Sequence, residues 1–338
     1  MYGSDFRNLV LFDPIKQGAD NLKIVSGYAT HTMASWHITE IEAQGFDPIS
    51  ITLIVGMCKF DGISVSAHNG FNSLVSGNRS VRQSKLKCQY VVDGTPVHSK
   101  LYLWEKNGFP FIAYMGSANY TQSAFSVSRR ELIESCSPDD AAIYFEKIEA
   151  DTMYCNHSEI EDKIRILPTH PILQAEETPA ISVRGSDVQR VTLSLLARGG
   201  ETGVRSGVNW GQRNGREPNQ AYIKLPANIA RTDFFPLEGN LSGKHNPHFS
   251  VLTDDGINLI LRVEQQNNKA ITTPLNNSLV GEYIRNRIGV ANGQYVTRKD
   301  LETYGRTDVT FYKIGDEQDV QYFMDFSPYA DKEQAKND

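Results

Sequence analysis

The stretch from Pro96 to Glu134 decides how this chain folds and what chemistry it can carry. It contains His98-Ser99-Lys100-Leu101-Tyr102-Leu103-Trp104, then Met115-Gly116-Ser117-Ala118-Asn119-Tyr120-Thr121, then Arg129-Arg130-Glu131-Leu132-Ile133-Glu134. The residues after Lys100 are β-formers, so His98 and Lys100 project to the same face of a strand. Residues 109–115 are predicted to form the returning strand, which brings the Gly-Ser-x-Asn motif to the same end of the sheet.

These side chains are suited to binding a phosphate. Lys100 and the Asn119 amide can donate hydrogen bonds to phosphate oxygens, and Ser117 is a supporting donor. Glycine at the end of the returning strand lets backbone approach a ligand closely. An uncharged His98 imidazole can attack phosphorus if a carboxylate such as Glu131 holds the proton of its other ring nitrogen.

Two alternatives remain open at this point. A His-x-Lys pair by itself is usually a solvated strand face, and only its combination with Gly-Ser-x-Asn and a placed glutamate makes the catalytic interpretation specific. Glu134 is the alternative to Glu131 as the partner of His98, since the register after Arg130 is not fixed by the sequence.

The order of these motifs resembles the phospholipase D superfamily, most closely its short nuclease branch. Members with the full motif carry an aspartate shortly after the lysine; here Glu105 lies near that position, and the acidic role falls to Glu131, as in the nuclease branch. The resemblance implies that His98 forms a phosphohistidine, that Lys100 and Asn119 hold the phosphate, and that Glu131 orients the histidine. It further implies phosphodiester hydrolysis in two displacements, without a metal or other cofactor.

The chain has a single His-x-Lys set, whereas the superfamily's chemistry needs two histidines. One attacks phosphorus, and the other, protonated, gives its proton to the leaving 3′ oxygen. We therefore expect a homodimer through the nuclease domain, with one shared site that cuts the two DNA strands in turn.

Length and charge predict two domains. The chain has 338 residues, and Leu167 to Ala180 holds three prolines and an acidic pair without periodicity. This composition predicts a semi-rigid linker over residues 167–182, between a domain at 1–166 and another at 183–338. The formal charge is −6 over residues 1–183, +5 over 184–306 and −5 over 307–338. A basic segment between acidic ones is typical of a domain that binds phosphates.

Targeting and redox signals are weak. No apolar run approaches the length of a membrane span, and the first twenty residues lack the pattern of a signal peptide, so we expect a cytoplasmic protein without a membrane partner. The cysteines are Cys58, Cys88, Cys136 and Cys155. Their wide spacing predicts reduced, mostly buried thiols rather than disulfides or a metal site.

Hydrophobic periodicity predicts a mixed α/β sandwich for the first domain. The expected strands are residues 22–29, 50–57 and 86–92, and the expected helices are 31–44, 64–75 and 138–154. His31 and His37 lie near the end of the first strand, and we interpret both as satisfied structural histidines.

The second domain opens with a strand at 191–197 and continues into a polar segment at 198–216. Six glycines and four arginines in this segment predict a mobile arm that reaches DNA, with arginine directed at phosphates or guanine and Asn or Gln at adenine. The alternative is a solvent-exposed loop with chance arginines. The candidate DNA-binding residues are Arg198, Arg205, Asn209, Trp210, Gln212, Arg213 and Arg216.

A second polar segment follows a strand at 257–264. Taken alone it is an ordinary hairpin tip, but with the first segment it forms two arms at one end of a β-rich domain, around the major groove. Its candidate DNA-binding residues are Gln265, Gln266, Asn267, Asn268 and Lys269. A helix at 278–288 and strands at 308–313 and 320–326 are expected to complete the domain.

This half resembles the carboxyl-terminal module of NgoFVII-type restriction endonucleases, a DNA-binding pseudobarrel of the plant B-three transcription-factor type. The resemblance is carried by Asn209-Trp210-Gly211-Gln212-Arg213-Asn214, Asn267-Asn268-Lys269-Ala270-Ile271, Tyr304-Gly305-Arg306-Thr307-Asp308 and Asp325-Phe326-Ser327. It implies a type II-like endonuclease that acts on double-stranded DNA beside a separate helicase-like ATPase and a cognate methyltransferase. The chain contains no P-loop pattern, so any ATP use belongs to a partner.

Two other function classes compete with this one. A DNA-binding regulator with a catalytically silent nuclease-like half would bind a defined site and never cut. A phospholipase would hydrolyse lipid headgroups. The intact His98, Lys100, Asn119 and Glu131 argue against the regulator, and the basic arms argue against the phospholipase.

Overall fold

The computed structural model describes residues 6–77, 83–126, 130–167, 188–238, 245–314 and 321–329. The chain divides into two compact units, Met1–Thr169 and His170–Asp338. Of the linker expected over 167–182, all but its first residue lies outside the described ranges. Within those ranges, no helix combines the length and the apolar character needed to cross a bilayer.

The first unit is built on a seven-stranded sheet in the order β7-β6-β5-β1-β2-β4-β8. β1, β2 and β4 run parallel, whereas the other neighbours pair antiparallel. The strands are β1 (Asn21–Ser26), β2 (Ser50–Val55), β4 (Lys85–Val91), β5 (Lys100–Lys106), β6 (Phe109–Gly116), β7 (Ile133–Cys136) and β8 (Thr152–Tyr154). A separate short parallel pair joins β3 (Ile63–Ser64) to β9 (Ile166–Leu167).

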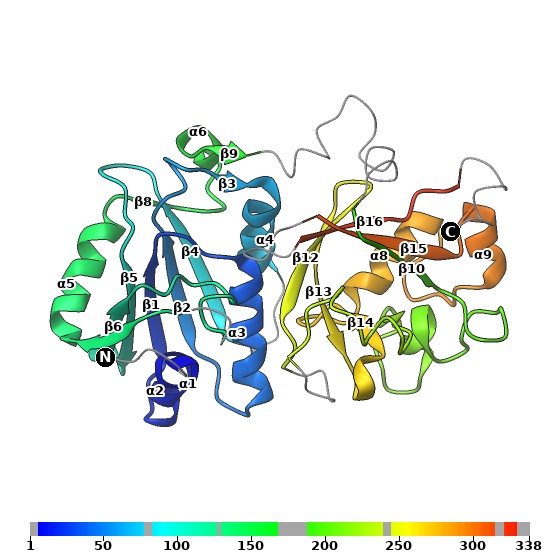
Figure 1. Cartoon of the computed structure of the whole chain (residues 1–338), viewed down its shortest axis with the longest axis horizontal. Coiled ribbons are helices and arrows are strands. Elements are labelled where there is room, and N and C mark those ends of the chain that lie inside the picture. Colours follow the sequence, from blue (N-terminus) through cyan, green and yellow to red (C-terminus); the bar gives the residue numbers. More distant parts are fainter. Residues whose placement is uncertain are drawn as a thin grey trace. The chain divides into compact units, whose positions relative to one another are not determined.

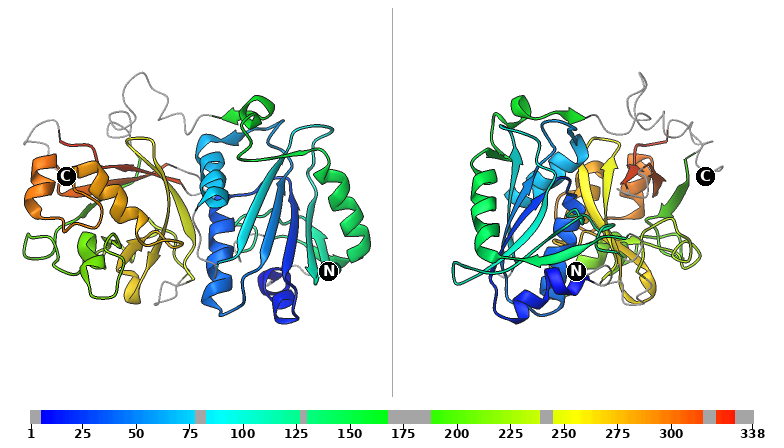
Figure 2. Two further views of the ribbon diagram at one scale, coloured as in Figure 1. Left: turned by 180° about the vertical axis from the view of Figure 1, so that it is seen from behind. Right: turned by 60° about the vertical axis from the view of Figure 1, so that its left-hand side comes forward.

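Helices cover both faces of this sheet, with α3 and α4 on one side and α5 on the other (Figure 1). Figure 2 shows the same layers from behind. Thr30, Ser64 and Ser137 cap these three helices by accepting hydrogen bonds from backbone N–H groups of the first turn. The helices are α1 (Phe6–Leu11), α2 (Asp13–Lys16), α3 (His31–Ala43), α4 (Val65–Ser76), α5 (Pro138–Glu149) and α6 (Ile160–Lys163).

The central strands are apolar on both faces because each face is covered. Val25, Ile54 and Leu103 pack with Phe145 of α5 on one side. The near-continuous apolar run of β2 follows from this double burial, as in other parallel sheets with two covered faces.

One expected helix is shorter than predicted. The sequence predicts a helix over 138–154, but α5 ends at Glu149 and residues 152–154 form β8. The chain turns at Asp151, whose carbonyl accepts from Val92 N at 2.9 Å, and β8 pairs with β4. Edge pairing therefore overrides the local helical pattern. All four cysteines are free, as the sequence predicts, and Cys58, Cys88 and Cys155 are buried.

The second unit is a curled seven-stranded sheet in the order β10-β15-β16-β12-β13-β14-β11. The two end strands approach one another, so the sheet is nearly closed into a barrel. All neighbours are antiparallel except β12 and β16. The strands are β10 (Arg190–Ser194), β11 (Ile223–Lys224), β12 (His248–Thr253), β13 (Asn258–Glu264), β14 (Ala270–Thr272), β15 (Asp308–Lys313) and β16 (Gln321–Asp325).

Two α-helices pack on the barrel core. Val280 and Ile284 of α8 and Leu301 of α9 join the apolar side chains of the strands in one cluster. The helices are α8 (Leu279–Ile288) and α9 (Arg298–Tyr304), with the 3₁₀ segments η2 (Gly207–Gln212) and η3 (Gln266–Asn268). The units are therefore α/β and mainly β, as predicted.

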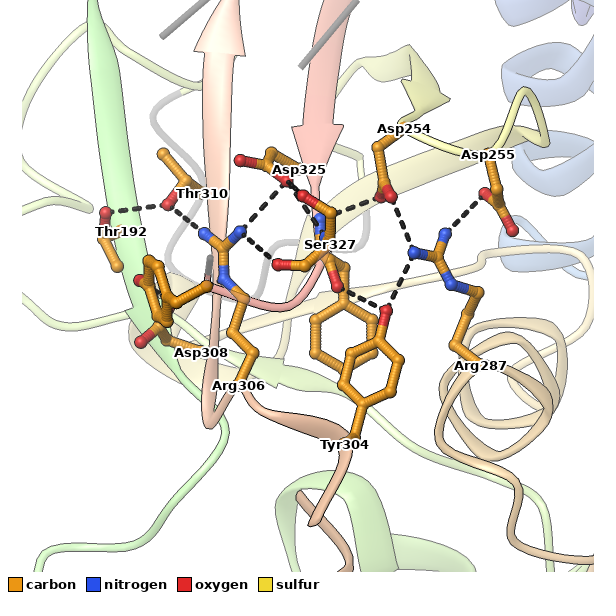
Figure 3. A network of polar contacts seen from close by, with 12 residues as sticks. Thr192, Asp254, Asp255, Arg287, Tyr304, Arg306, Asp308, Thr310, Asp325 and Ser327 are labelled. Atoms are coloured by element: carbon orange, nitrogen blue, oxygen red, sulfur yellow. Dashed lines mark hydrogen bonds and ion pairs between the residues drawn. The ribbon is translucent and has the colours of Figure 1, made fainter. Parts of the chain in front are cut away.

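A buried ion-pair network ties α9 to the last strands (Figure 3). Arg306 is 2% exposed; its guanidinium lies 3.0 Å from Asp325 Oδ1 and 3.0 Å from Asp308 Oδ1, and it donates to Thr310 Oγ1 at 2.7 Å. The motifs at 304–308 and 325–327, which carry part of the resemblance found in the sequence, are thus structural elements of the barrel.

A second arginine continues the same network. Arg287 of α8 pairs with Asp254 at 2.6 Å and donates to Tyr304 Oη at 2.8 Å. Tyr304 in turn donates to the carbonyl of Phe326 at 2.6 Å.

Candidate active site and DNA-binding arms

The ends of β1, β5 and β6 meet at one end of the first sheet. Lys100 is the first residue of β5 and pairs with Ser26, the last residue of β1. β6 returns antiparallel to β5 and ends at Gly116, directly before the loop that carries Asn119. The hairpin and the register therefore bring the His-x-Lys and Gly-Ser-x-Asn motifs together, as the sequence predicts.

His98 and Lys100 are in direct contact. Lys100 Nζ lies 3.0 Å from His98 Nδ1 and 3.2 Å from Nε2, and it donates to the His98 carbonyl at 2.5 Å. An ammonium can only donate, so the nitrogen that accepts from it carries a lone pair. His98 is exposed whereas Lys100 is buried. This arrangement presents an imidazole to solvent beside a cation held from within the sheet.

Burial sets the electrostatics of the lysine. Desolvation lowers the pKa of Lys100, and the negative charge of Glu131 opposes that shift. The ammonium thus lies within electrostatic reach of the carboxylate.

The Asn119 amide is oriented by the end of β1. Its Oδ1 accepts from Tyr28 N at 3.1 Å and lies 3.3 Å from Ser26 Oγ. A backbone N–H can only donate, so the atom that faces it is the amide oxygen, and the amide nitrogen is turned to the other side. A nitrogen in that position is the donor that a phosphate oxygen requires.

Glu131 lies beside Ser117, two residues before the start of β7. Ser117 Oγ donates to Glu131 Oε2 and accepts from Leu132 N at 3.0 Å. Glu134 lies further along β7, opposite Met115. The register therefore places Glu131, rather than Glu134, at the loop end of the strands. The Glu131 carboxylate accepts a hydrogen bond from Ser117, and within the described residues it makes none with the His98 ring.

Gly27 and Gly56, which no sequence motif indicated, make room for the segment that carries His98. A Cβ on Gly56 would stand 1.9 Å from Val97 O, and one on Gly27 would stand 2.9 Å from His98 Cδ2. The segment that carries His98 therefore crosses directly over the ends of β1 and β2. For Gly116 the close neighbour is the Leu132 carbonyl, 2.0 Å from an added Cβ, so this glycine serves the approach of β7.

Glu105, His31 and His37 lie outside this cluster. Glu105 is at the far end of β5, where it pairs with Lys23 at 2.7 Å and accepts from Asn21 at 2.5 Å. His37 bonds Tyr120 Oη at 2.9 Å, as expected of a satisfied structural histidine. His31 differs, since neither ring nitrogen has a hydrogen-bond partner in the described structure. Burial lowers the pKa of both histidines to about 4.

In the second unit, part of the segment 198–216 is packed against the barrel, in contrast to the mobile arm predicted from the sequence. Val208, Asn209 and Gly211 are buried in η2. The Asn209 amide donates to Val296 O at 2.8 Å and accepts from Val296 N at 2.9 Å, so it holds the segment to the barrel instead of offering a base contact. Gln212 likewise donates to the carbonyls of Pro218 and Gly293.

The arginines of this segment face solvent. Arg198, Arg205, Arg213 and Arg216 are all exposed. The guanidinium of Arg216 lies 4.0 Å from the centroid of the Trp210 ring. These side chains keep the exposure that a phosphate or base contact requires.

The segment at 265–269 shows the same division. Gln266, Asn267 and Lys269 are exposed, and Gln265 is partly exposed. Asn268 is buried, and its Oδ1 accepts from Asn246 Nδ2 at 2.9 Å. This contact gives Asn268 a structural part, in contrast to the base readout expected from the sequence.

β11 lies between the two segments. Tyr222, just before β11, donates from its backbone N to Gly207 O at 3.1 Å, and Leu225, just after it, donates to Lys269 O at 2.8 Å. The two segments are therefore neighbours on one side of the barrel, as predicted for a pair of arms.

Two family models match the chain. Residues 4–162 match the N-terminal PLD (phospholipase D) domain of the NgoFVII restriction endonuclease, and residues 183–315 match the C-terminal B3-like DNA-binding domain of the same endonuclease. No curated protein matches the chain significantly.

Solved structures similar to this chain cover less than half of it. Nuc, a phospholipase D family member from Salmonella typhimurium, is 12% identical over 44% of this chain and 89% of its own, with a TM-score of 0.32. NucT from Helicobacter pylori is 15% identical over 44% of this chain and 90% of its own, with a TM-score of 0.30. Polyphosphate kinase from Porphyromonas gingivalis is 13% identical over 48% of this chain and 26% of its own, with a TM-score of 0.31.

Proposed function

Because this chain belongs to the NgoFVII restriction endonuclease family and joins that family's phospholipase D-like and B3-like domains, we propose that it is a sequence-specific, metal-independent endonuclease. One observation carries the proposal. The Lys100 ammonium lies 3.0 Å from the solvent-exposed His98 imidazole, at the edge of the sheet that also presents Asn119.

The proposed reaction has two displacements. Lys100 and Asn119 donate to the non-bridging oxygens of the scissile phosphate, which neutralises charge and fixes phosphorus opposite His98. The imidazole lone pair forms an N–P bond, and the bond from phosphorus to the 3′ oxygen breaks as that oxygen takes a proton from an acid. In the second displacement, the group that gave its proton to the 3′ oxygen takes a proton from water, and the water oxygen attacks phosphorus as the N–P bond breaks. The free imidazole is regenerated, and the DNA is left with a 5′-phosphate end.

The acid for the leaving oxygen requires a second histidine. The chain has one His-x-Lys motif, so we propose that a second copy of the chain contributes its own His98 to a shared site. Within each copy, Ser117 and Glu131 support the lysine and the phosphate loop, and Glu131 orients the histidine when the shared site assembles.

Sequence recognition is proposed for the exposed members of the two arms. These are Arg198, Arg205, Arg213 and Arg216 in the first segment, and Gln266, Asn267 and Lys269 in the second. Gln265 and Trp210 support them. A separate ATPase and a methyltransferase remain proposed partners.

The test is digestion of a phage genome in EDTA by the full chain, followed by sequencing of the fragment ends. We expect cleavage at a defined site or at a fixed distance from one, and none with His98→Ala, because the imidazole supplies the nucleophile that a metal-bound water would otherwise supply. Acid-quenched wild-type protein should carry a labile DNA adduct on His98. Site-specific binding with no cut under any condition would favour the regulator, and activity abolished by EDTA would refute the metal-independent route.

The shared site has its own test. Light scattering should give a dimer for the wild-type chain. Mixing wild type with excess His98→Ala protein should suppress cleavage, because mixed dimers lack one histidine. If the wild-type chain were a monomer and cleaved DNA at a rate unaffected by added His98→Ala protein, the shared site would be contradicted.

A further inference from the structure

Tyr28 lies between the two groups that the proposed chemistry depends on most. It follows β1 by two residues, and its ring stands edge-on to the His98 imidazole, with centroids 5.6 Å apart and planes at 79°. Its backbone N donates to Asn119 Oδ1 at 3.1 Å. One residue thus contacts the nucleophile through its side chain and orients the phosphate-binding amide through its main chain.

The ring of Tyr28 is fixed at its far end. Its hydroxyl donates to Asp61, which follows β2 in a turn where Asp61 N donates to Met57 O at 2.9 Å. Met57 N in turn donates to Gly27 O at 3.0 Å, which joins that turn to the end of β1. The hydrogen bond to Asp61 raises the pKa of Tyr28, so the hydroxyl stays a donor. The phenol is therefore a poor base at neutral pH.

The surroundings of His98 explain why such a contact matters. Lys100 Nζ lies on one side of the imidazole, and the glycine backbone at residue 27 lies against Cδ2. The ring is otherwise exposed, and an exposed ring exchanges rotamers freely unless a neighbour restricts it. A nucleophile must be held close to the line of attack, because misplacement by about 1 Å costs on the order of 100-fold in rate.

We propose that Tyr28, anchored by Asp61, is a positioning residue that restricts the His98 imidazole to its attacking orientation. The inference rests on the proposed function, since it assigns Tyr28 a part in the same site. Tyr28 is an exposed residue outside the buried core, so its replacement should leave the fold intact.

The first measurement needs no turnover. In the full chain labelled with ¹³C-histidine, the relaxation of the His98 Cε1–H pair reports motion of the ring, and the His98→Ala spectrum assigns it. We expect a more mobile ring in Tyr28→Leu than in wild type, and an intermediate one in Asp61→Asn. Equal mobility in wild type and Tyr28→Leu would overturn the inference, whatever the protein's activity.

The second measurement compares two substrates. Tyr28→Leu should lower kcat by about 100-fold on both duplex DNA and bis(4-nitrophenyl) phosphate, a small phosphodiester without bases, with little change in KM. Tyr28→Phe keeps the ring but loses the hydrogen bond to Asp61, so its loss should be intermediate, as should that of Asp61→Asn. The matched control is Tyr154→Leu, at an exposed tyrosine of β8, which should behave as wild type.

The outcomes separate the two claims. Loss on DNA alone, through KM, would mean that Tyr28 contacts nucleotides and would overturn the positioning role. Wild-type rates on both substrates in Tyr28→Leu would overturn it as well. A wild-type chain that cuts neither substrate, or a His98→Ala chain that cuts as well as wild type, would instead refute the proposed function.

Discussion

Gly56→Ala should lower both stability and the rate of cleavage, although Gly56 lies 42 residues before His98 in the sequence. The added methyl would stand 1.9 Å from Val97 O and 2.8 Å from Val97 C, both backbone atoms of the residue before His98. Backbone cannot rotate away as a flexible side chain can. The two segments must therefore part by about 1 Å, which carries His98 with it.

The magnitude follows from that displacement. Forcing a methyl into a packed interior costs about 1–3 kcal/mol of unfolding free energy. A shift of about 1 Å at the nucleophile costs on the order of 100-fold in the rate of the chemical step. Gly27→Ala is an instructive companion, because its methyl meets the imidazole itself, 2.9 Å from Cδ2. The ring can turn aside, so this variant should lose activity with a smaller loss of stability.

The assay pairs urea unfolding of the full chain with single-turnover cleavage of a cognate duplex in EDTA. Gly199→Ala is the control, since an added Cβ there meets nothing within 4 Å, and it should match wild type in both measurements. If Gly56→Ala were as stable and as active as wild type, the crossing of residue 97 over the end of β2 would not position the nucleophile.

Three further predictions concern polar side chains, one in the first unit and two in the second. Burial lowers the pKa of His31 to about 4 from the ordinary 6.5, so between pH 6.5 and 4 the unfolded chain binds a proton that the folded chain does not, and stability should fall as pH falls. In urea unfolding at several pH values, His31→Leu should lose less stability over this range than wild type. An equal pH dependence in the two proteins would contradict the buried neutral imidazole. Arg306→Ala should cost about 3–5 kcal/mol, because it leaves the buried Asp325 without its cation, whereas Arg298→Ala, which removes an exposed ion pair, should change stability little. Similar unfolding midpoints for the two variants would refute the difference. In titrations of cognate and scrambled duplexes at one salt concentration, Arg213→Ala should weaken cognate binding by about 1–3 kcal/mol if Arg213 reads a base. Asn268→Ala should instead lower the thermal midpoint of the protein, because it removes the buried contact with Asn246. If Asn268→Ala lost cognate binding without losing stability, Asn268 would be a base reader after all.

The sequence by itself determined the order of the elements and the proposed chemistry. A run of β-forming residues after Lys100 predicts β5, and β6 is predicted as the returning strand. Their antiparallel pairing brings Lys100 and Asn119 to the same end of the sheet. Helix α3 is confirmed within one residue of its predicted end, and Thr30 supplies its cap. These features could be predicted because neighbours in sequence decide them: strand period, turn residues and caps act over a few positions.

Contacts between distant segments were decided only by the tertiary structure. The place of Glu134 opposite Met115 depends on the register of β7 against β6, and a slip of one residue would turn its side chain to the other face of the sheet. Asn209 and Asn268 carry the polar composition of a base reader, yet each is drawn inward by backbone or side-chain groups far along the chain. A composition count cannot tell an amide that faces DNA from one that satisfies a buried carbonyl.

The surroundings of His98 depend on the same kind of contact. Gly56 lies 42 residues before His98 in the sequence, and Tyr28 lies 70 residues before it. Neither belongs to the motifs from which the catalytic residues are predicted. Parallel pairing of β1 and β2 brings their ends under the segment before β5. There the absence of a side chain at Gly56 and the ring of Tyr28 determine how much space His98 has. Local pattern therefore determined which groups can react, and long-range packing decided how they are held.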